Sequence, residues 1–215
     1  MASENDSRRG FFRGGLDIPD DMAEGIYGKG PPPVVEECRE LGLIIRIAQE
    51  NARYLATGRE NPKREDDVET LMAMYEHKPE FRAHVLWALG EMRCSEAAVM
   101  IIPIARNWER HVETDGELVE AAVRALGNID APGQSVFILQ RIAETVSAPE
   151  WLRERAAISA EKVAARRGGE ELCRVRIALD LCGARQLPGV QRWIERNKPE
   201  RKPPMKIILQ QGGKC

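Results

Sequence analysis

PEFRAHVLWALGEM (79–92), GELVEAAVRALGNI (116–129) and PEWLRERAAISAEKV (149–163) are the three segments that decide the fold of this chain. In each segment, apolar or small residues recur at intervals of 4, 3 and 4. That spacing places them on one face of an α-helix. The residues of these faces are Phe81, Val85, Ala88 and Met92, then Leu118, Ala122, Ala125 and Ile129, then Leu152, Ala156, Ser159 and Val163.

A second, more continuously apolar segment follows each of these helices. The second segments span 95–110, 133–146 and 169–183. Successive copies are offset by 37 and then 34 residues, which is enough for two helices of about four turns with short connections. Each copy therefore predicts an antiparallel helical hairpin, and Pro103 predicts a kink in the first of the second helices.

Further helices are predicted on both sides of the three copies. The stretch 34–58 has apolar residues at alternating spacings of 4 and 3, the stretch 64–75 follows as its partner, and 188–197 predicts a short final helix. The face of 34–58 that we expect to be buried consists of Val34, Cys38, Leu41, Ile45, Ala48, Ala52 and Leu55. The total is about nine helices.

Two of the copies share a short motif. The segments AAVRALGNIDAPGQSVFILQRIAE (121–144) and, more loosely, HVLWALGEMRCSEAAVMIIPIAR (84–106) carry Ala-Leu-Gly, at 125–127 and 88–90, before an apolar second helix. Together with the loop aspartate Asp130, these features resemble HEAT-type repeats, in particular the short bacterial class that is also present in phycobilin lyases.

The third copy departs from this motif, with Ala160 and Glu161 where Leu-Gly would fall. The resemblance covers roughly 63–196. It implies an all-α fold, a right-handed superhelical stack of about four antiparallel helical hairpins, with extended N- and C-terminal tails. This architecture is called a HEAT-like solenoid below.

The composition agrees with a helical protein. The chain has 215 residues and a mass of 24.1 kDa, with 43% apolar, 31% charged and 5% aromatic residues. These values exclude a disulfide scaffold and a fully disordered chain. We expect three parts: a Gly/Pro-rich N-terminal extension (1–33), a HEAT-like helical repeat domain (34–196) and a basic C-terminal tail (197–215).

Both tails carry apolar residues that a plain linker lacks. The N-terminal extension contains Phe11 and Phe12, so we expect it to dock onto the stack or onto a partner. The C-terminal segment MKIILQ (205–210) favours a β-strand that adds to another protein's sheet, or else a disordered tail. The candidate contact residues of this tail are Lys202, Lys206, Ile207 and Ile208.

The sequence also bears on location. No run approaches the ~20 apolar residues of a membrane span, and MASENDSRRGFFRGG lacks the apolar core of a secretion signal. The five cysteines form no CxxC pair, which fits buried thiols in a reducing compartment. We therefore expect a cytoplasmic protein without membrane insertion.

The formal net charge of −2 conceals an uneven distribution. Residues 1–148 carry 17 basic and 26 acidic side chains, a charge of −9, whereas 149–215 carry 15 basic and 8 acidic side chains, a charge of +7. Such a basic third offers a surface for an anionic partner, an electrostatic match to another part of the chain or another protomer, or a solvated face without a partner. The sequence leaves these readings open.

The residues that carry chemistry show no catalytic pattern. His77, His84 and His111 form no HExxH motif and no cluster with cysteine. Cys173 and Cys182 are nine residues apart on one predicted helix, too far for a disulfide. The chain also lacks a GxSxG motif and a Walker loop. The sequence therefore predicts no catalytic residue, no metal site and no cofactor.

A superhelical stack presents a concave face, which we expect its second helices to form. Side chains that bind carboxylates or phosphates lie outside the apolar stripes of these helices. They are Arg106, Arg110, Gln140, Arg141, Arg174 and Arg176. Trp108 is a candidate aromatic anchor on the same face. The alternative is that these are ordinary surface residues paired with nearby glutamates.

Repeats of the resembled class serve mostly as binding scaffolds. The sequence therefore predicts a non-enzymatic scaffold or adaptor that holds another protein and belongs to a larger assembly. The alternative is a nucleic-acid-binding HEAT-like protein that uses the basic C-terminal third. A chromophore-lyase-like role rests only on the resemblance, and a glycosylase-like activity would need an aromatic and carboxylate pocket that the sequence does not place.

Overall fold

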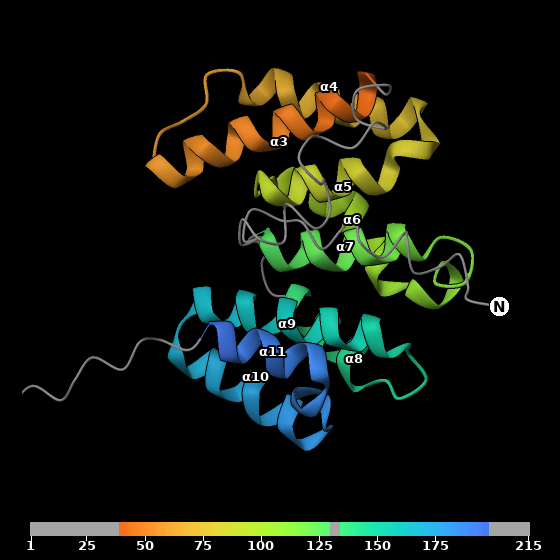
Figure 1. Cartoon of the computed structure of the whole chain (residues 1–215), viewed down its shortest axis with the longest axis vertical. Helices are drawn as coiled ribbons and strands as arrows, with labels where there is room; N and C mark the ends of the chain where they lie inside the picture. The colour runs from red at the N-terminus through yellow and green to blue at the C-terminus, as the bar shows by residue number, and fades with distance from the viewer. Residues whose placement is uncertain (1–38, 130–133, 198–215) are drawn as a thin grey trace, which may run out of the picture.

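The computed structural model describes residues 39–129 and 134–197 (Figure 1). Within these ranges the chain has nine α-helices and no strand, which confirms the predicted all-α class. The helices are α3 (Arg39–Thr57), α4 (Arg64–His77), α5 (Arg82–Glu91), α6 (Ala98–Arg106), α7 (Gly116–Asn128), α8 (Gln134–Glu144), α9 (Glu150–Arg167), α10 (Gly169–Leu181) and α11 (Pro188–Arg196). Short 3-10 helices lie between some of them: η2 (Pro79–Phe81), η3 (Ser95–Ala97), η4 (Trp108–Arg110) and η5 (Ala184–Gln186).

Several predictions concern residues outside the described ranges. The N-terminal extension (1–33) and all of the C-terminal tail except Asn197 fall there. The individual residues concerned are Phe11, Phe12, Val34, Cys38, Asp130, Lys202, Lys206, Ile207 and Ile208.

Helices that alternate along the sequence pack side by side. α3 contacts α5, α5 contacts α7, and α7 contacts α9; we call these four helices the first-helix row. α11 packs against α9 at one end of the row. Of the intervening helices, α4 packs against α5, α6 against α7, and both α8 and α10 against α9. Along the long axis of the molecule, α3 and α4 lie at one end, α5 to α7 in the middle, and α8 to α11 at the other end (Figure 1).

The helix faces predicted from the three copies form the core. Every residue of these faces except Phe81 is buried, and Phe81 is partly buried against the same core. Burial of aliphatic side chains stabilises the fold by about 25 cal/mol per Å² of apolar surface removed from water. The 4-3-4 spacing therefore identified the helix faces that hold the first-helix row together.

Two glycines let neighbouring helices of the first-helix row approach closely. A Cβ atom added at Gly90 (α5) would lie 2.6 Å from the Cα atom of Ala125 (α7). One added at Gly127 (α7) would lie 2.6 Å from the Cβ atom of Ser159 (α9). Both distances are far below van der Waals contact, so each position accepts only glycine without a shift of the helices. The glycine of the Ala-Leu-Gly motif is thus a packing residue.

Glu161 (α9) stands in the third copy at the position that Gly90 and Gly127 hold in the first two. Its side chain is only 1% exposed. A buried carboxylate needs charged or hydrogen-bonding partners, because desolvation strongly disfavours an isolated charge. At this end of the row, the close glycine contact is therefore replaced by a buried carboxylate that needs polar partners.

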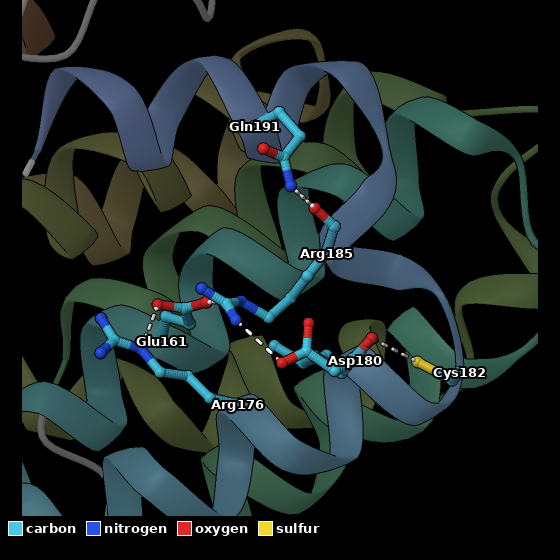
Figure 2. Close-up of polar contacts among 7 residues, drawn as sticks. Glu161, Arg176, Asp180, Cys182, Arg185 and Gln191 are labelled. Atoms are coloured by element: carbon cyan, nitrogen blue, oxygen red, sulfur yellow. Dashed lines mark hydrogen bonds and ion pairs between the residues drawn. The ribbon is translucent and has the colours of Figure 1, made fainter.

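Arginines from beyond α9 supply those partners (Figure 2). The Nε atom of Arg176 (α10) lies 3.0 Å from one oxygen of Glu161, and the Nε atom of Arg185 (η5) lies 2.9 Å from the other. Arg185 also contacts Asp180 at 2.9 Å, and its carbonyl accepts a bond from the Gln191 side chain. Although burial lowers the pKa of Arg185, Asp180 and Glu161 together raise it above its usual value. This network joins α9, α10, η5 and α11.

The segment 95–110 differs from the single kinked helix that was predicted. It consists of η3, α6 and η4 in succession, with Pro103 inside α6. Because Pro103 has no backbone N–H, the turn before it lacks one helical hydrogen bond. α6 ends three residues later, at Arg106.

The buried face of α3 also differs from the prediction. Its buried residues are Leu41, Ile44, Ile47, Ala48 and Asn51, whereas the predicted face residue Leu55 is 38% exposed. Asn51 was not part of the predicted face. In the structure, a network of side-chain hydrogen bonds with the following loop and α4 satisfies this amide; its members are Asn51, Asn61 and Asp67.

Candidate functional site

A groove crosses the C-terminal ends of all four helices of the first-helix row. It has a volume of about 430 Å³ that is accessible to water-sized molecules. α3 contributes small and apolar side chains, and the later helices contribute polar and charged ones. The lining residues are Ala52, Leu55, Ala56, Gly90, Glu91, Arg93, Arg124, Asn128, Lys162 and Arg166. We call this site the basic groove.

The charge of the basic groove is strongly uneven. Its lining carries four cationic side chains, those of Arg93, Arg124, Lys162 and Arg166, against the single carboxylate of Glu91. The described residues thus form a local excess of +3 in a protein whose net charge is −2. Such a concentration attracts anions along a concave surface.

Glu91 has partners from the neighbouring helix. A guanidinium nitrogen of Arg124 lies 3.4 Å from Glu91 Oε1, and the side-chain amide of Asn128 donates to the same oxygen at 3.2 Å. Burial, and then the nearby charge of Arg155, lower the pKa of Arg124, while Glu91 and Glu120 oppose that shift. Arginine stays protonated in proteins, so Arg124 remains a cation at the base of the groove.

Two arginines at or near the groove bind backbone carbonyls at the C-terminal ends of helices. The Arg166 side chain donates to the carbonyl of Gly127 at 2.7 Å, and Arg64 donates to the carbonyl of Met92 at 2.9 Å. Carbonyls at helix C-termini lack partners within the helix and carry the negative end of its dipole. These contacts hold cationic side chains beside the groove in fixed positions.

Arg93 differs from these arginines in that its backbone is strained. It follows α5 with φ 51°, in the left-handed region. The N–H groups of Arg93 and Cys94 donate to the carbonyls of Gly90 and Leu89, each at 3.0 Å, which is the Schellman arrangement of a helix end. The other described residues with positive φ are all glycines: Gly58, Gly168 and Gly183.

The arginine side chain at this turn costs roughly 1 kcal/mol or more in backbone strain, which glycine would avoid. Among the described residues, the side chain of Arg93 makes no hydrogen bond or ion pair. The hydrogen bonds of Arg93 come from its main chain: the N–H bond to Gly90, and a long bond of 3.5 Å that the Arg93 carbonyl accepts from the Arg64 side chain. No side-chain contact of Arg93 within the described fold offsets the free-energy cost of its backbone strain.

The residues predicted on the second helices lie elsewhere and do not line the basic groove. Arg106 donates to Gln134 of α8 at 2.9 Å, Arg174 pairs with Glu171 of its own helix, and Arg176 belongs to the Glu161 network. Arg110 and Arg141 are exposed, and Gln140 is half-buried. Pairing with neighbouring residues thus accounts for Arg106, Arg174 and Arg176.

Trp108 differs from its predicted role. Its side chain is 7% exposed and belongs to the hydrophobic core, so it is not available as an exposed aromatic anchor. The reason is local: α6 ends at Arg106, and the 3-10 turn of η4 follows. A 3-10 turn advances each residue by a larger angle than an α-helix does, so the face extrapolated from α6 no longer applies.

A second hollow lies between α3 and α4, with a volume of about 560 Å³. Its charged lining residues balance, with Arg59 and Arg64 against Glu60 and Glu65. Leu55 lines both hollows. Because it has no net charge, this hollow gives no indication of a ligand class.

The residues of the basic groove were not predicted, although the sequence contains a signal for them. Glu91, Asn128 and Lys162 each directly follow the motif position of Gly90, Gly127 and Glu161. All three line the groove. One helix position, repeated at offsets of 37 and 34 residues, therefore faces the groove in each copy.

Residues 39–129 and 134–197 offer neither a metal site nor a membrane-spanning helix. No group of three or more His, Cys, Asp or Glu side chains in these ranges is placed to hold a metal ion. None of the described helices is both long and apolar enough to span a membrane. Comparison of the chain with protein-family models, curated proteins and solved structures gives no match.

Proposed function

We propose that this protein is a non-enzymatic scaffold or adaptor that holds a segment of another protein in its basic groove, as a subunit of a cytoplasmic assembly. The observation that carries the proposal is the groove itself, which is lined by all four helices of the first-helix row. A site built from successive copies of one helix is typical of repeat proteins, whose stacked units create extended binding surfaces.

The proposal includes a HEAT-like solenoid as the architecture. Its support is the repeated packing position of Gly90 and Gly127, together with the alternation of row helices and intervening helices. In this view the basic groove replaces the second-helix arginines as the main partner surface. The two tails would add contacts of their own within the assembly.

Affinity capture from the native host tests this proposal. The full-length protein is compared with the charge reversal Arg93→Glu/Lys162→Glu in the groove. Arg106→Glu/Arg141→Glu is the matched control, because it reverses two exposed charges on α6 and α8. We expect wild type and control to recover the same defined protein in stoichiometric amounts after nuclease treatment, and the groove variant to lose it.

Two results would contradict the proposal. One is a monomeric protein that recovers no partner in any form. The other is loss of the partner from the α6/α8 control but not from the groove variant, which would move the surface to the second helices. Recovery of nucleic acid that modest salt releases would favour the nucleic-acid alternative, because phosphate contacts weaken steeply with salt.

A further inference from the structure

We infer that the occupant of the basic groove is an acidic, extended segment of a partner protein with an apolar residue at one end. The inference rests on the proposed function, since it names the chemistry of the partner that the scaffold holds. Its basis is the order of residues along the groove, the groove's length, and Arg93, a lining residue with a strained backbone.

The first step is the polarity gradient. The α3 end of the groove is lined by Ala52, Leu55 and Ala56, and the part formed by α5 to α9 carries the four cations. A ligand that matches both parts has one apolar side chain beside α3 and carboxylates toward α9. Charge complementarity of this kind selects the partner and also fixes its direction.

The second step is the size. Axes of packed helices are roughly 8–10 Å apart, so a ligand that crosses from α3 to α9 spans about 24–30 Å. Extended chain covers that distance with roughly eight residues. The groove has a volume of about 430 Å³, so it encloses only one side of such a segment and leaves the rest exposed to solvent. An extended peptide of this length can follow the lining residues from α3 to α9.

The third step separates a peptide from a nucleic acid. None of the lining residues is aromatic, so bases would find no stacking surface in the groove. Glu91 lies among the cations, held by Arg124 and Asn128, and would face a continuous row of phosphates. A peptide can place a neutral residue opposite Glu91 and acidic residues on either side. The observations therefore favour a peptide.

The fourth step is Arg93. The described fold keeps an arginine at a left-handed turn, where its side chain makes no hydrogen bond or ion pair with other described residues. The same side chain lines the groove. A contact with a carboxylate of the ligand gives this side chain a function that the isolated fold does not.

Fluorescence anisotropy with the full-length chain tests the inference. The probe is a labelled peptide of about ten residues in which one leucine precedes a run of glutamates. The comparison probes are the same peptide with glutamines and a single-stranded oligothymidylate of about the same length. We expect the glutamate peptide to bind at least about tenfold more tightly than either comparison probe at equal salt.

Two substitutions locate the binding. Arg93→Gly should weaken the glutamate peptide about two- to fivefold, and Arg93→Gly/Lys162→Gln by about tenfold. Arg141→Gln, on exposed α8 surface, is the matched control and should leave the affinity unchanged. Because Arg93→Gly removes backbone strain, loss of affinity in this variant cannot be explained by unfolding.

Equal binding of the glutamate and glutamine peptides, absence of binding, or tighter binding of the oligonucleotide would overturn the inference. So would an equal loss in the Arg141→Gln control. These results are distinguishable from failure of the proposed function. If the host partner is captured but the glutamate peptide does not displace it, the scaffold proposal stands and the acidic ligand is wrong.

Discussion

One repeated helix position makes two different kinds of contact along the first-helix row. In the middle of the row it is glycine, and the backbones of α5, α7 and α9 approach each other through Gly90 and Gly127. At the end of the row it is Glu161, which is buried and bound by two arginines. A glycine at this position lets the next row helix pack closely against it. Glu161 instead binds arginines from α10 and η5.

The last of the described helices, α11, lies at the end of the row where Glu161 is buried. α11 packs on α9 near its own first turn, where the N–H of Gly189 donates to the Glu154 side chain. Arg185, just before α11, reaches back to Glu161. The comparison teaches that one substitution in a repeated motif can change a helix contact from apolar packing to an ion-pair network.

The largest effect is expected from Gly90→Ala. In most helix interiors this change stabilises by up to about 1 kcal/mol. Here the new methyl group would meet the backbone of Ala125, so we expect a loss of about 3 kcal/mol in the free energy of unfolding, measured by denaturant titration. Gly169→Ala is the control, because a Cβ atom there has no neighbour within 4 Å. Equal effects of the two changes would refute the close-contact account.

A smaller loss is expected from Glu161→Gln, which keeps the shape but removes the charge. Two charge-assisted hydrogen bonds are weakened, although Arg185 and Arg176 are 20% and 47% exposed and can turn toward water. We therefore expect a loss of about 1.5–3 kcal/mol. Thermal unfolding should shift by a few degrees for a chain of this size. An unchanged midpoint would show that the network contributes nothing to holding this end of the row.

The pair Arg155–Glu120 is an ion pair within the middle of the row. It joins α9 to α7 at 2.9 Å, with the side chains 25% and 18% exposed. Arg155→Ala should cost about 1 kcal/mol, measured in the same titration. A cost equal to that of Glu161→Gln would mean that charge pairing, rather than glycine packing, dominates the middle of the row as well.

The smallest effect is expected from Arg174→Ala. Its partner Glu171 is on the same helix, and the Arg174 side chain is 73% exposed. Exposed pairs contribute about 0–0.5 kcal/mol and are screened by salt. A loss above about 1 kcal/mol would show that the second-helix arginines have a structural role that their exposure does not indicate.

The sequence predicted the class of fold and the buried faces of the three copies, because a 4-3-4 pattern of apolar residues places them on one face of a helix. It also located the change in the third copy at Glu161. It did not predict the partners of Glu161, because Arg176 and Arg185 reach it only through the packing of α10 and η5. Asn51 was missed for the same reason, since its hydrogen bonds come from distant residues.

The site was less predictable than the fold. Arginines on the second helices satisfied a general rule for binding surfaces, but the groove formed at the C-terminal ends of the first-helix row. Its position depends on how closely the helices approach, and that distance is set by Gly90 and Gly127. The backbone conformation of Arg93 has no signal in the sequence, because arginine is uncommon at left-handed positions.

The most direct test of the account measures one variant in two ways. For Arg93→Gly, the free energy of unfolding and the capture of the host partner are determined on the same full-length preparation. The account predicts that the free energy of unfolding rises by about 1 kcal/mol, because glycine relieves the backbone strain. It also predicts that partner recovery falls, because the arginine side chain that contacts the partner is removed. A variant that is more stable and retains its partner fully would contradict the assignment of the basic groove as the binding site.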